Sequence, residues 1–539
     1  MVEFMNRLRQ HLPRPFIILG FLFFIQWLLL FNAQQGIWDG SFYYAFARSI
    51  AFDGDLQISN DLVLSYPTAP SVIVEKDFHL DLTETGRVHS PFAIGSSFIW
   101  AIWLGILRAG NALVQLFGLG WKNATGYDWG FVTGIGAFSA LLGWLAFWLA
   151  YRLASAETSK TAALWSAATL LFATPMLYYQ FREPFYSHAT AALTTTLCIY
   201  VWWRGLDRKR TVASGIVLGA LIGVSSLVRW QHLIYLALPG ISALWSFLQL
   251  PVSERRRQWQ SSLVYLTAIG VTALLIFSLQ MGIWRVFYGS WITVPQGSAY
   301  VDWSAPNLLP TLFSSYRGLL PWLPAIIPAF VGLGWLARRR PKLIVPLLVI
   351  VVLEVYINGS TRDWFGGGGY GPRRYTSELA IIVLGYAAFI QLLWQRQGAR
   401  LTQAIAALLA LLLGLQQWVL LRFGIPEQIG GSHSSMYPTY NWSDVSLTTF
   451  LGQIGERLPR LFRQPIDGFV FPNSPLDWLI NKGEFPLPHL AGLLLAATFL
   501  ALIWAFRPWD RLSARGRPWL FVVMGLTLLL LQLWIGFLA

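Results

Sequence analysis

The sequence has one cysteine and few charged side chains, and both shortages limit what the protein can be. Cys198 is the only thiol among 539 residues, which excludes an intrachain disulfide and a metal site built from several cysteines. Charged residues make up 12% of the chain, against roughly 25% in a typical soluble domain, while hydrophobic residues make up 55%. With a mean hydropathy of +0.52, this composition predicts an integral membrane protein.

The hydrophobic residues gather in long runs. Most runs are near the roughly 20 residues that a helix needs to cross the hydrocarbon layer, and they lack the alternation of a membrane barrel strand. We therefore predict an all-α polytopic membrane protein of 13 spans in a single domain, residues 1–539. The predicted spans are 16–33, 130–151, 161–179, 185–203, 212–228, 230–249, 262–284, 318–337, 343–357, 376–394, 401–421, 489–506 and 518–538.

The positions of the basic residues predict the topology. The net charge of +14 could indicate a nucleic-acid partner, but in a membrane protein the placement of each charge matters more than the total. Arg7, Arg9 and Arg14 precede the first span, and no small-residue cleavage site follows it. We therefore expect a retained anchor with a cytoplasmic amino terminus, and no nucleic-acid partner.

The apolar run "SPFAIGSSFIWAIWLGIL" at 90–107 decides the orientation of everything after it. Leaving it out of the spans puts "RGLDRKR", "SERRRQ", "ARRRPK", "RQGAR" and "RPWDRLSARGR" on the cytoplasmic side, as the positive-inside rule requires. We therefore predict that residues 90–119 form an interfacial or re-entrant helical segment. Functional residues then belong to the outer face, whose long segments are 34–129, 288–317, 358–375 and 422–488.

The first outer segment begins with "GIWDGSFYYAFARSIAFDGDLQISND" and holds three acids. Asp39 is predicted to start a short helix, because aspartate accepts hydrogen bonds from the first free amides of a helix. Asp53 and Asp55 lie in "FDGDL", which is typical of a turn. A carboxylate held at the membrane surface by a helix start is well placed to act as a general base, so Asp39 is the candidate.

Two further groups of ionisable residues fall at the outer ends of spans. The hairpin "YYQFREPFYSHA" contains Arg182, Glu183 and His188, which are either functional or simply a solvated tip and a hydrogen-bonded helix residue. Arg317, Arg373 and Arg374 each stand before an apolar span, where a guanidinium can hold phosphate oxygens or contact lipid headgroups. Arg229 is a weaker case of the same kind.

Two other motifs bear on cofactors. The glycine run 366–369 permits close approach of a ligand, but it lacks the Lys-Ser/Thr ending of a Walker loop and the strand that precedes a Rossmann loop. None of the outer histidines has the close His/acid spacing of a metalloprotease, although a site assembled from distant loops stays open. These histidines are His79, His89, His188, His232, His433 and His489.

In order along the chain, these motifs resemble those of the GT-C superfamily of glycosyltransferases, which use polyprenyl-phosphate-linked sugars. The resemblance rests on "WDGSFYYAFARSIAFDGDL", "HSPFAIGSSFIW", "REPFYSH", "LFSSYRGLLPWLPA" and "DWFGGGGYGPRRY". It implies an enzyme of the bacterial inner membrane with its site on the outer face. Its partners would be a polyprenyl-phosphate sugar, membrane lipid, and a glycan, lipid or protein acceptor.

The resemblance also implies a role for each candidate residue. Asp39 would be the base for an inverting displacement, and Glu183 a second acid that positions the acceptor or an arginine. Arg317, Arg373 and Arg374, together with Arg182, would neutralise the lipid-phosphate leaving group. Sugar or acceptor contacts would come from Tyr43, Tyr44, His188 and His89. No metal cofactor is implied, and metal dependence stays open.

The sequence departs from two branches of the superfamily. Asp39 is followed by Gly40, whereas protein O-mannosyltransferase-like members carry an Asp-Glu pair, so a protein acceptor is in doubt. A soluble carboxy-terminal domain and a metal-binding acid set of the oligosaccharyltransferase type are not found. The alternatives are an O-antigen ligase or polymerase, a secondary transporter and a non-catalytic assembly subunit.

Overall fold

A computed structural model describes residues 14–32, 39–65, 82–118, 120–423 and 447–483. Throughout these ranges the regular structure is helical, and extended pairing is limited to two isolated bridges, Leu82–Val88 and Val301–Thr361. The predicted spans 489–506 and 518–538, and the histidines His79, His433 and His489, lie outside the described residues. The all-α architecture predicted from the sequence is confirmed for the described part.

The helices follow the apolar runs of the sequence. The first half contains α2 (Arg14–Leu30), α3 (Asp39–Arg48), the π-helix η1 (Ser49–Asp53), α4 (Ser59–Ser65), α6 (Gly95–Gln115), α7 (Trp129–Glu157), α8 (Lys160–Ala173), α9 (Met176–Phe181), α10 (His188–Gly205), α11 (Val212–Val228), η2 (Trp230–Leu236), α12 (Ala237–Leu248) and α13 (Val252–Tyr288). The second half contains η3 (Ser298–Tyr300), α14 (Leu308–Phe313), α15 (Leu319–Trp322), α16 (Ile326–Ala337), α17 (Pro341–Ser360), η4 (Arg373–Glu378), α18 (Leu379–Gln397), α19 (Ala399–Phe423), α20 (Leu447–Arg463), α21 (Pro465–Phe469) and α22 (Pro475–Ile480).

Seven described helices are long and apolar enough to cross a membrane. Six of them coincide with predicted spans, and the seventh is α6; the seven are Gly95–Gln115, Trp129–Glu157, Trp230–Leu248, Val252–Tyr288, Pro341–Ser360, Arg373–Gln397 and Ala399–Phe423. The predicted span 161–179 is divided into α8 and α9 by Thr174 and Pro175, because proline cannot continue the helix it follows. The total of 13 spans stays a prediction.

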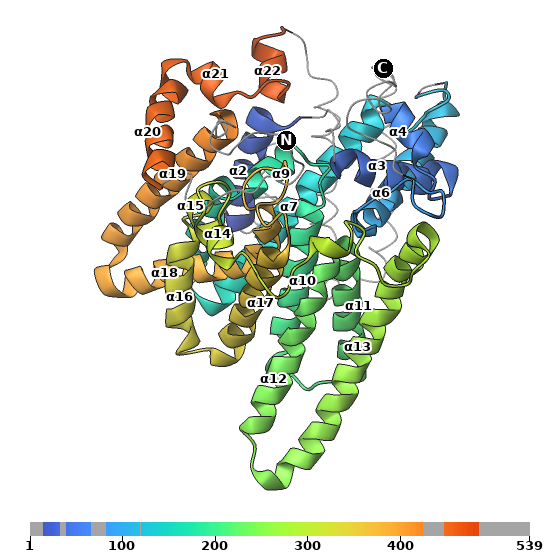
Figure 1. The fold of residues 1–539 in the computed structure, drawn as a ribbon. Helices are drawn as coiled ribbons and strands as arrows, with labels where there is room; N and C mark the ends of the chain where they lie inside the picture. The colour runs from blue at the N-terminus through green and yellow to red at the C-terminus, as the bar shows by residue number, and fades with distance from the viewer. Residues whose placement is uncertain (1–13, 33–38, 66–81, 119, 424–446, 484–539) are drawn as a thin grey trace.

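The segment predicted to be interfacial forms α6, a helix of 21 residues. It packs against α3, its neighbour in Figure 1, where the hydroxyl of Ser97 donates to the Tyr43 carbonyl at 2.8 Å. Its first turn touches the end of α11, since a Cβ on Gly95 would come within 2.3 Å of the Leu227 carbonyl carbon. The structure thus packs α6 against α3, the first helix of the same predicted outer segment, while its length and hydropathy also suit a span.

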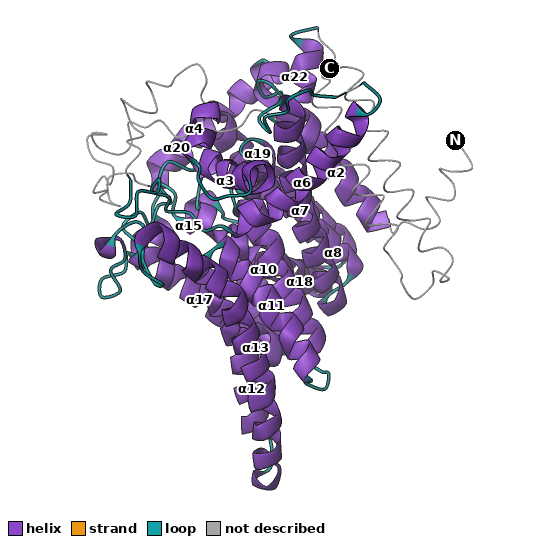
Figure 2. Ribbon diagram, turned by 90° about the vertical axis from the view of Figure 1, so that its right-hand side faces the viewer, coloured by secondary structure: helices purple, strands orange, loops and turns teal. Residues whose placement is uncertain are grey.

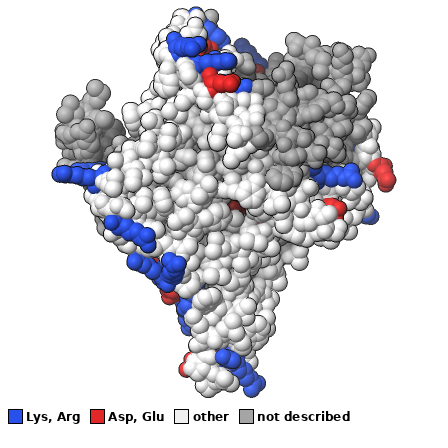
Figure 3. Space-filling view, turned by 60° about the vertical axis from the view of Figure 1, so that its left-hand side comes forward, with Lys and Arg blue, Asp and Glu red and all other residues white. Residues whose placement is uncertain are grey.

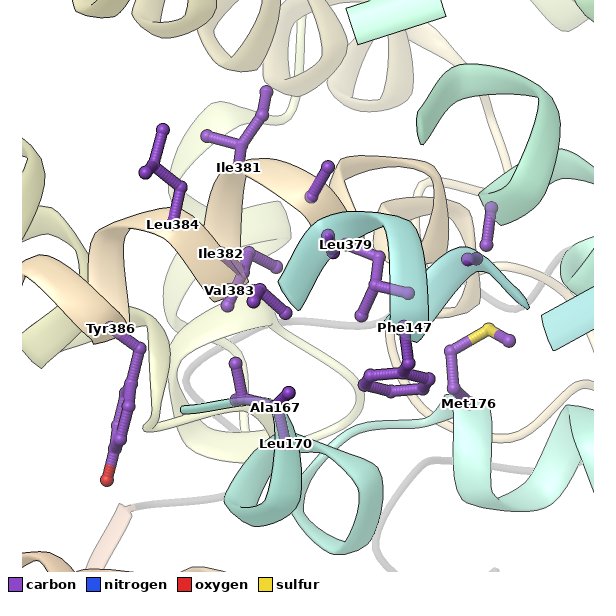
Figure 4. Close-up of a cluster of buried hydrophobic side chains, with 14 of the residues drawn as sticks. Phe147, Ala167, Leu170, Met176, Leu379, Ile381, Ile382, Val383, Leu384 and Tyr386 are labelled. Carbon is purple, nitrogen blue, oxygen red and sulfur yellow. The ribbon is translucent and has the colours of Figure 1, made fainter. Parts of the chain in front are cut away.

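The centre of the bundle is a dense apolar core shared by α7, α8, α9 and α18. Phe147 of α7, Leu170 of α8 and Tyr386 of α18 are fully buried in it. Figure 4 shows Met176 and the run Leu379–Leu384 around the same centre. Large side chains held at this density fix the relative positions of the helices that carry the site.

A stripe of glycines brings α11 against α13. Gly215, Gly219 and Gly223 recur every fourth residue, so they share one face of α11. A Cβ on Gly219 would lie 2.5 Å from the Ile269 carbonyl oxygen of α13, which leaves no room for a larger residue. Small residues at this spacing are a common way to pack helices in lipid, where apolar burial alone gives little driving force. Beyond this contact, α12 and α13 project from the rest of the bundle (Figures 1 and 2).

The two ends of the bundle differ in charge. "RGLDRKR" joins α10 to α11, "ARRRPK" joins α16 to α17 and "RQGAR" joins α18 to α19. Arg340 of the second connection lies 3.4 Å from Asp207 of the first, so these two connections share one end of the bundle. Figure 3 shows a face with a largely uncharged middle, basic side chains down its left and lower-left edge, and charged side chains of both signs at the top and on the right. The opposite ends of α10, α11, α17 and α18 come together at the other end of the bundle, where the candidate site lies.

Candidate active site

A polar cavity of about 260 Å³ opens at the end of the bundle opposite the basic connections. Its charged and histidine side chains come from the start of α3, the start of α10, the end of α11, the end of α17 and the start of η4, and Pro91–Ala93, Gln296 and Tyr300 complete the lining. Its lining includes three arginines, two aspartates and one histidine, which are Arg229, Arg373, Arg374, Asp39, Asp363 and His188. Residues from five separate parts of the chain therefore converge on one concave site.

Asp39 is held in the cavity by an ion pair. It is the first residue of α3, as the sequence predicts, and its carboxylate accepts a hydrogen bond of 2.7 Å from Arg373 Nη1 through Oδ2. The guanidinium of Arg373 also lies over the ring of Tyr186, 5.6 Å from its centroid. Charge-assisted bonds of this length fix both partners, so Asp39 has a defined orientation and keeps Oδ1 for another contact.

Arg374 is fully engaged with protein groups. Its Nη2 lies 2.5 Å from Asp363 Oδ1 and 2.8 Å from the hydroxyl of Tyr300, and its Nη1 donates to Thr361 Oγ1 at 2.5 Å. Tyr300 also donates to Asp363. This cluster makes a rigid wall on the side of the cavity formed by α17 and η3.

Arg229 stands apart from the other two arginines because no described carboxylate forms an ion pair with it. Its Nη2 lies 2.8 Å from Nδ1 of His188 and 3.4 Å from the hydroxyl of Ser187. The same Nη2 is 3.2 Å from Nε2 of His188, so the guanidinium lies against both ring nitrogens of the imidazole. His188 is 1% exposed, and its Nδ1 is also 3.0 Å from Thr376 Oγ1.

The charges of the lining therefore do not cancel. Three guanidiniums face two carboxylates, and the two direct ion pairs are Asp39 with Arg373 and Asp363 with Arg374. Arg229 supplies one positive charge in excess. A cavity with this balance attracts a ligand group with a single negative charge.

The glycine run forms the loop that holds Arg373 in place. A Cβ on Gly369 would come within 2.6 Å of Arg373 Cδ and 2.8 Å of the Tyr179 hydroxyl. That hydroxyl accepts from the amide of Tyr370 at 2.7 Å and donates to its carbonyl at 3.0 Å, which fastens the loop to α9. The absence of a side chain at Gly369 thus lets the arginine pass beneath the loop.

Tyr43 and Glu183, two predicted site residues, differ in their position relative to the cavity. Tyr43 lines the cavity and is 6% exposed. Glu183 is in the turn between α9 and α10, beside the cavity but not in its lining. Burial raises the pKa of its carboxyl to about 7, with the negative charge of Asp39 adding to the effect and Arg182 opposing it.

Two predicted phosphate-binding arginines point away from the cavity lining. Arg182 donates to the backbone carbonyl oxygens of Leu30 at 3.2 Å and Pro472 at 2.9 Å. Arg317 donates to the carbonyl oxygen of Gly367 and lies over the ring of Tyr316. Its φ of 110° is in a region that non-glycine residues rarely adopt, so the loop contact holds the backbone of Arg317 in a strained form.

Two predicted sugar contacts are also placed elsewhere. The hydroxyl of Tyr44 donates to the carbonyl of Gly126 at 2.5 Å, and its side chain is fully buried. His89 has Nε2 2.8 Å from the carbonyl oxygen of Pro295, outside the lining. Sequence reasoning gave no role to Asp363, Tyr300 or Thr361, although Asp363 lies within the motif "DWFGGGGYGPRRY".

No group of three or more His, Cys, Asp or Glu side chains in the described residues has the arrangement of a metal site.

An apolar groove of about 510 Å³ adjoins the polar cavity. Trp230 lines both, and the rest of the groove comes from η2, α13 and the chain around Ile292. Cationic and strongly apolar surfaces therefore meet at Trp230.

Comparison with known proteins finds a family match in part of the chain. Residues 132–284, from α7 to α13, match the family model of dolichyl-phosphate-mannose-protein mannosyltransferases. Over this part of the chain, the match supports the resemblance to membrane glycosyltransferases that use lipid-linked donors. No curated protein matches the chain in a direct search.

Two similar solved structures are of an oligosaccharyltransferase from Archaeoglobus fulgidus. One is AglB in complex with an inhibitory peptide and a dolichol-phosphate, at 11% identity and a TM-score of 0.43, covering 82% of this chain and 64% of that one. The other is a complex with zinc and sulfate, at 12% identity and a TM-score of 0.39, covering 80% of this chain and 58% of that one. This chain thus spans about three-fifths of the length of these neighbours.

Proposed function

We propose that the protein transfers a sugar from a polyprenyl-phosphate donor to an acceptor hydroxyl on the outer face of a bacterial inner membrane, with inversion. The observation that carries the proposal is the cavity in which Asp39 lies among Arg229, Arg373 and Arg374. The family match supports a membrane glycosyltransferase with a lipid-linked donor. The cavity lies opposite the basic connections, as an outer-face site would under the positive-inside rule.

The charge balance supports a phosphodiester donor. A sugar linked through one phosphate to a polyprenyl chain has a single negative charge, which matches the one excess positive charge of the lining. Arg229 binds this phosphate, with Arg373 next to it. When the bond from sugar to phosphate breaks, the second negative charge develops beside these guanidiniums, where it is stabilised most.

Asp39 acts as the base in a single displacement. The acceptor oxygen forms a bond to the anomeric carbon, its proton passes to Oδ1 of Asp39, and the bonding pair to phosphate leaves with the phosphate oxygen. Oδ2 keeps its bond to Arg373, so the carboxylate stays oriented through the reaction. The polyprenyl chain lies in the adjoining apolar groove, whose wall at Trp230 is shared with the cavity.

A secondary transporter is the second candidate, because the bundle contains two fully buried acids. Glu354 of α17 and Glu378 of η4 are at most 2% exposed, and both oxygens of Glu378 lack a hydrogen-bond partner among the described residues. Acids buried in membrane helices are common in ion-coupled transport. Uptake of a labelled sugar or ion without chemical transfer would favour this candidate.

The direct test is sugar transfer by purified protein in nanodiscs, with radiolabelled undecaprenyl-phosphate sugars and an envelope extract as acceptor. Asp39→Asn should lower the rate by about 100-fold or more, the range for loss of a general base. Asp207→Asn is the matched control, since Asp207 is exposed near the basic connection of α10. Full activity of Asp39→Asn would exclude the base assignment, and absence of transfer by the wild type would exclude the proposed function.

A further inference from the structure

A second polar groove, of about 570 Å³, lies next to the candidate active site. It is lined by the segment that follows η3 and by the residues just after α17, which are Ala299, Val301, Asp302, Trp303, Ser304, Ala305, Asn307, Ser360, Thr361 and Arg362. Of the residues that line the candidate active site, only Thr361 also lines this groove. Because Thr361 lines both spaces, the groove leads directly to the wall of the cavity.

The groove has a rigid backbone. The amide of Asp302 donates to the Ser360 carbonyl at 2.7 Å, and the amide of Arg362 donates to the Tyr300 carbonyl at 2.9 Å. The amide of Asn307 donates to the carbonyl of Gly359 at 2.7 Å. These bonds fasten the segment to the end of α17, so its side chains are presented in fixed positions.

Trp303 provides an exposed aromatic surface on this rigid segment. Half of its surface is exposed, and its ring stacks on Tyr356 at a centroid distance of 6.0 Å. The hydroxyl of Tyr356 donates to the carbonyl of Trp303 at 2.6 Å, which fixes the tryptophan from below. An immobilised indole offers a large contact surface at low cost in conformational entropy, and the C–H face of a sugar ring packs well on it.

Polar groups surround this aromatic surface, and their charges offset each other. Hydrogen bonds from Ser304 lower the pKa of Asp302, and its Oδ1 is engaged by the Ser304 amide and hydroxyl. Arg362 is exposed and supplies the opposite charge. Together with Asn307, these side chains give donors and acceptors without net charge, which suits hydroxyl groups better than a charged ligand.

We propose that this groove binds an extended neutral saccharide, the acceptor of the transfer reaction, with one sugar ring on Trp303. The acceptor hydroxyl then reaches the cavity past Thr361. The hydroxyl of Thr361 accepts from Arg374 and donates to the Asn358 carbonyl at 2.8 Å, so this passage has a fixed edge. The identity of the occupant as an acceptor rests on the proposed function, whereas binding of a saccharide does not.

The test is hydroxyl-radical labelling of Trp303 in nanodisc-embedded protein, read by peptide mass spectrometry. The probes are malto-, manno-, cello- and chito-oligosaccharides at millimolar concentration. At least one should slow the labelling of Trp303 several-fold and leave Trp291 unchanged, since Trp291 is equally exposed but outside the groove. Arg362→Gln should reduce the protection, and Trp291→Ala should not, with melting temperatures confirming that both variants fold.

Two results would overturn the proposal. Labelling of Trp303 that no saccharide changes would exclude a carbohydrate site. Protection of Trp303 by the phosphatidylglycerol bilayer of the nanodisc, compared with detergent, without any effect of saccharide would assign the groove to the lipid interface. Since this measurement requires neither donor nor turnover, its failure is distinct from a failure of the transfer assay.

Discussion

Replacement of Arg229 by glutamine should weaken donor binding without weakening the fold. The guanidinium of Arg229 contacts His188 and Ser187 but forms no ion pair with a described carboxylate. A partly buried guanidinium loses part of its hydration, and without an ion pair this cost is not offset by attraction to a carboxylate. Its removal therefore does not destabilise the ligand-free protein in the way that breaking an ion pair would. The same charge is the one available to a donor phosphate.

The expected size of the effect follows from one charge-assisted contact. Hydrogen bonds to charged groups contribute about 1.5–3 kcal/mol, and each 1.4 kcal/mol changes an affinity about tenfold. Arg229→Gln should therefore raise the Kd for undecaprenyl phosphate by about 10- to 100-fold. Because no ion pair with a described carboxylate is lost, the melting temperature should be unchanged or higher.

The assay is a titration of undecaprenyl phosphate into nanodisc-embedded protein by native mass spectrometry, with thermal unfolding of the same samples. Arg285→Gln is the control, since Arg285 is exposed near the end of α13 and outside the cavity. Arg373→Gln offers a contrast, because it leaves Asp39 without its ion pair and should lower both affinity and melting temperature. A Kd for Arg229→Gln within a factor of about two of the wild type would refute the reasoning, since the expected loss is at least about tenfold.

Two other predictions concern the loop and the turn beside the cavity. Gly369→Ala places a methyl group against Arg373 and should lower transfer by about 100-fold through misplacement; Gly368→Ala, with nothing within 4 Å, should keep the wild-type rate. Because the pKa of Glu183 is about 7 in the fold and 4.5 for the free side chain, stability should fall by about 3 kcal/mol as pH rises from 4.5 to 7. Glu183→Gln should remove this loss in thermal unfolding at pH 5 and pH 8, and an unchanged pH dependence would contradict the assignment.

The sequence predicts which residues reach this end of the bundle better than it predicts where their side chains point. Asp39, His188, Arg229 and Arg373 all fall at span ends that the positive-inside rule assigns to one face, and the structure brings them to one cavity. Arg182 satisfies the same rule, but carbonyl oxygens of Leu30 and Pro472 engage its guanidinium. Such contacts join distant segments, so no local pattern indicates them.

Helix boundaries, too, are predicted from the sequence only where they do not depend on tertiary contacts. The apolar run 161–179 predicts a helix of spanning length, and the break at Thr174 and Pro175 is visible in the sequence as a proline within the run. The 90–107 segment is harder, because its length and hydropathy suit a span as well as an interfacial helix. Its packing against α3 and the end of α11 depends on tertiary contacts, which the sequence pattern does not indicate, and its interfacial placement stays a prediction.

The ion pair between Asp39 and Arg373 also has a consequence for biosynthesis, because the two residues are 334 positions apart. At about 5–20 residues per second, the ribosome needs roughly 20 to 70 s to reach Arg373 after Asp39 has been made. During that interval the first outer segment is present without the partner that orients its carboxylate. A chain interrupted before η4 can insert most of its helices and still lack Arg373, so the site cannot assemble until synthesis has passed η4.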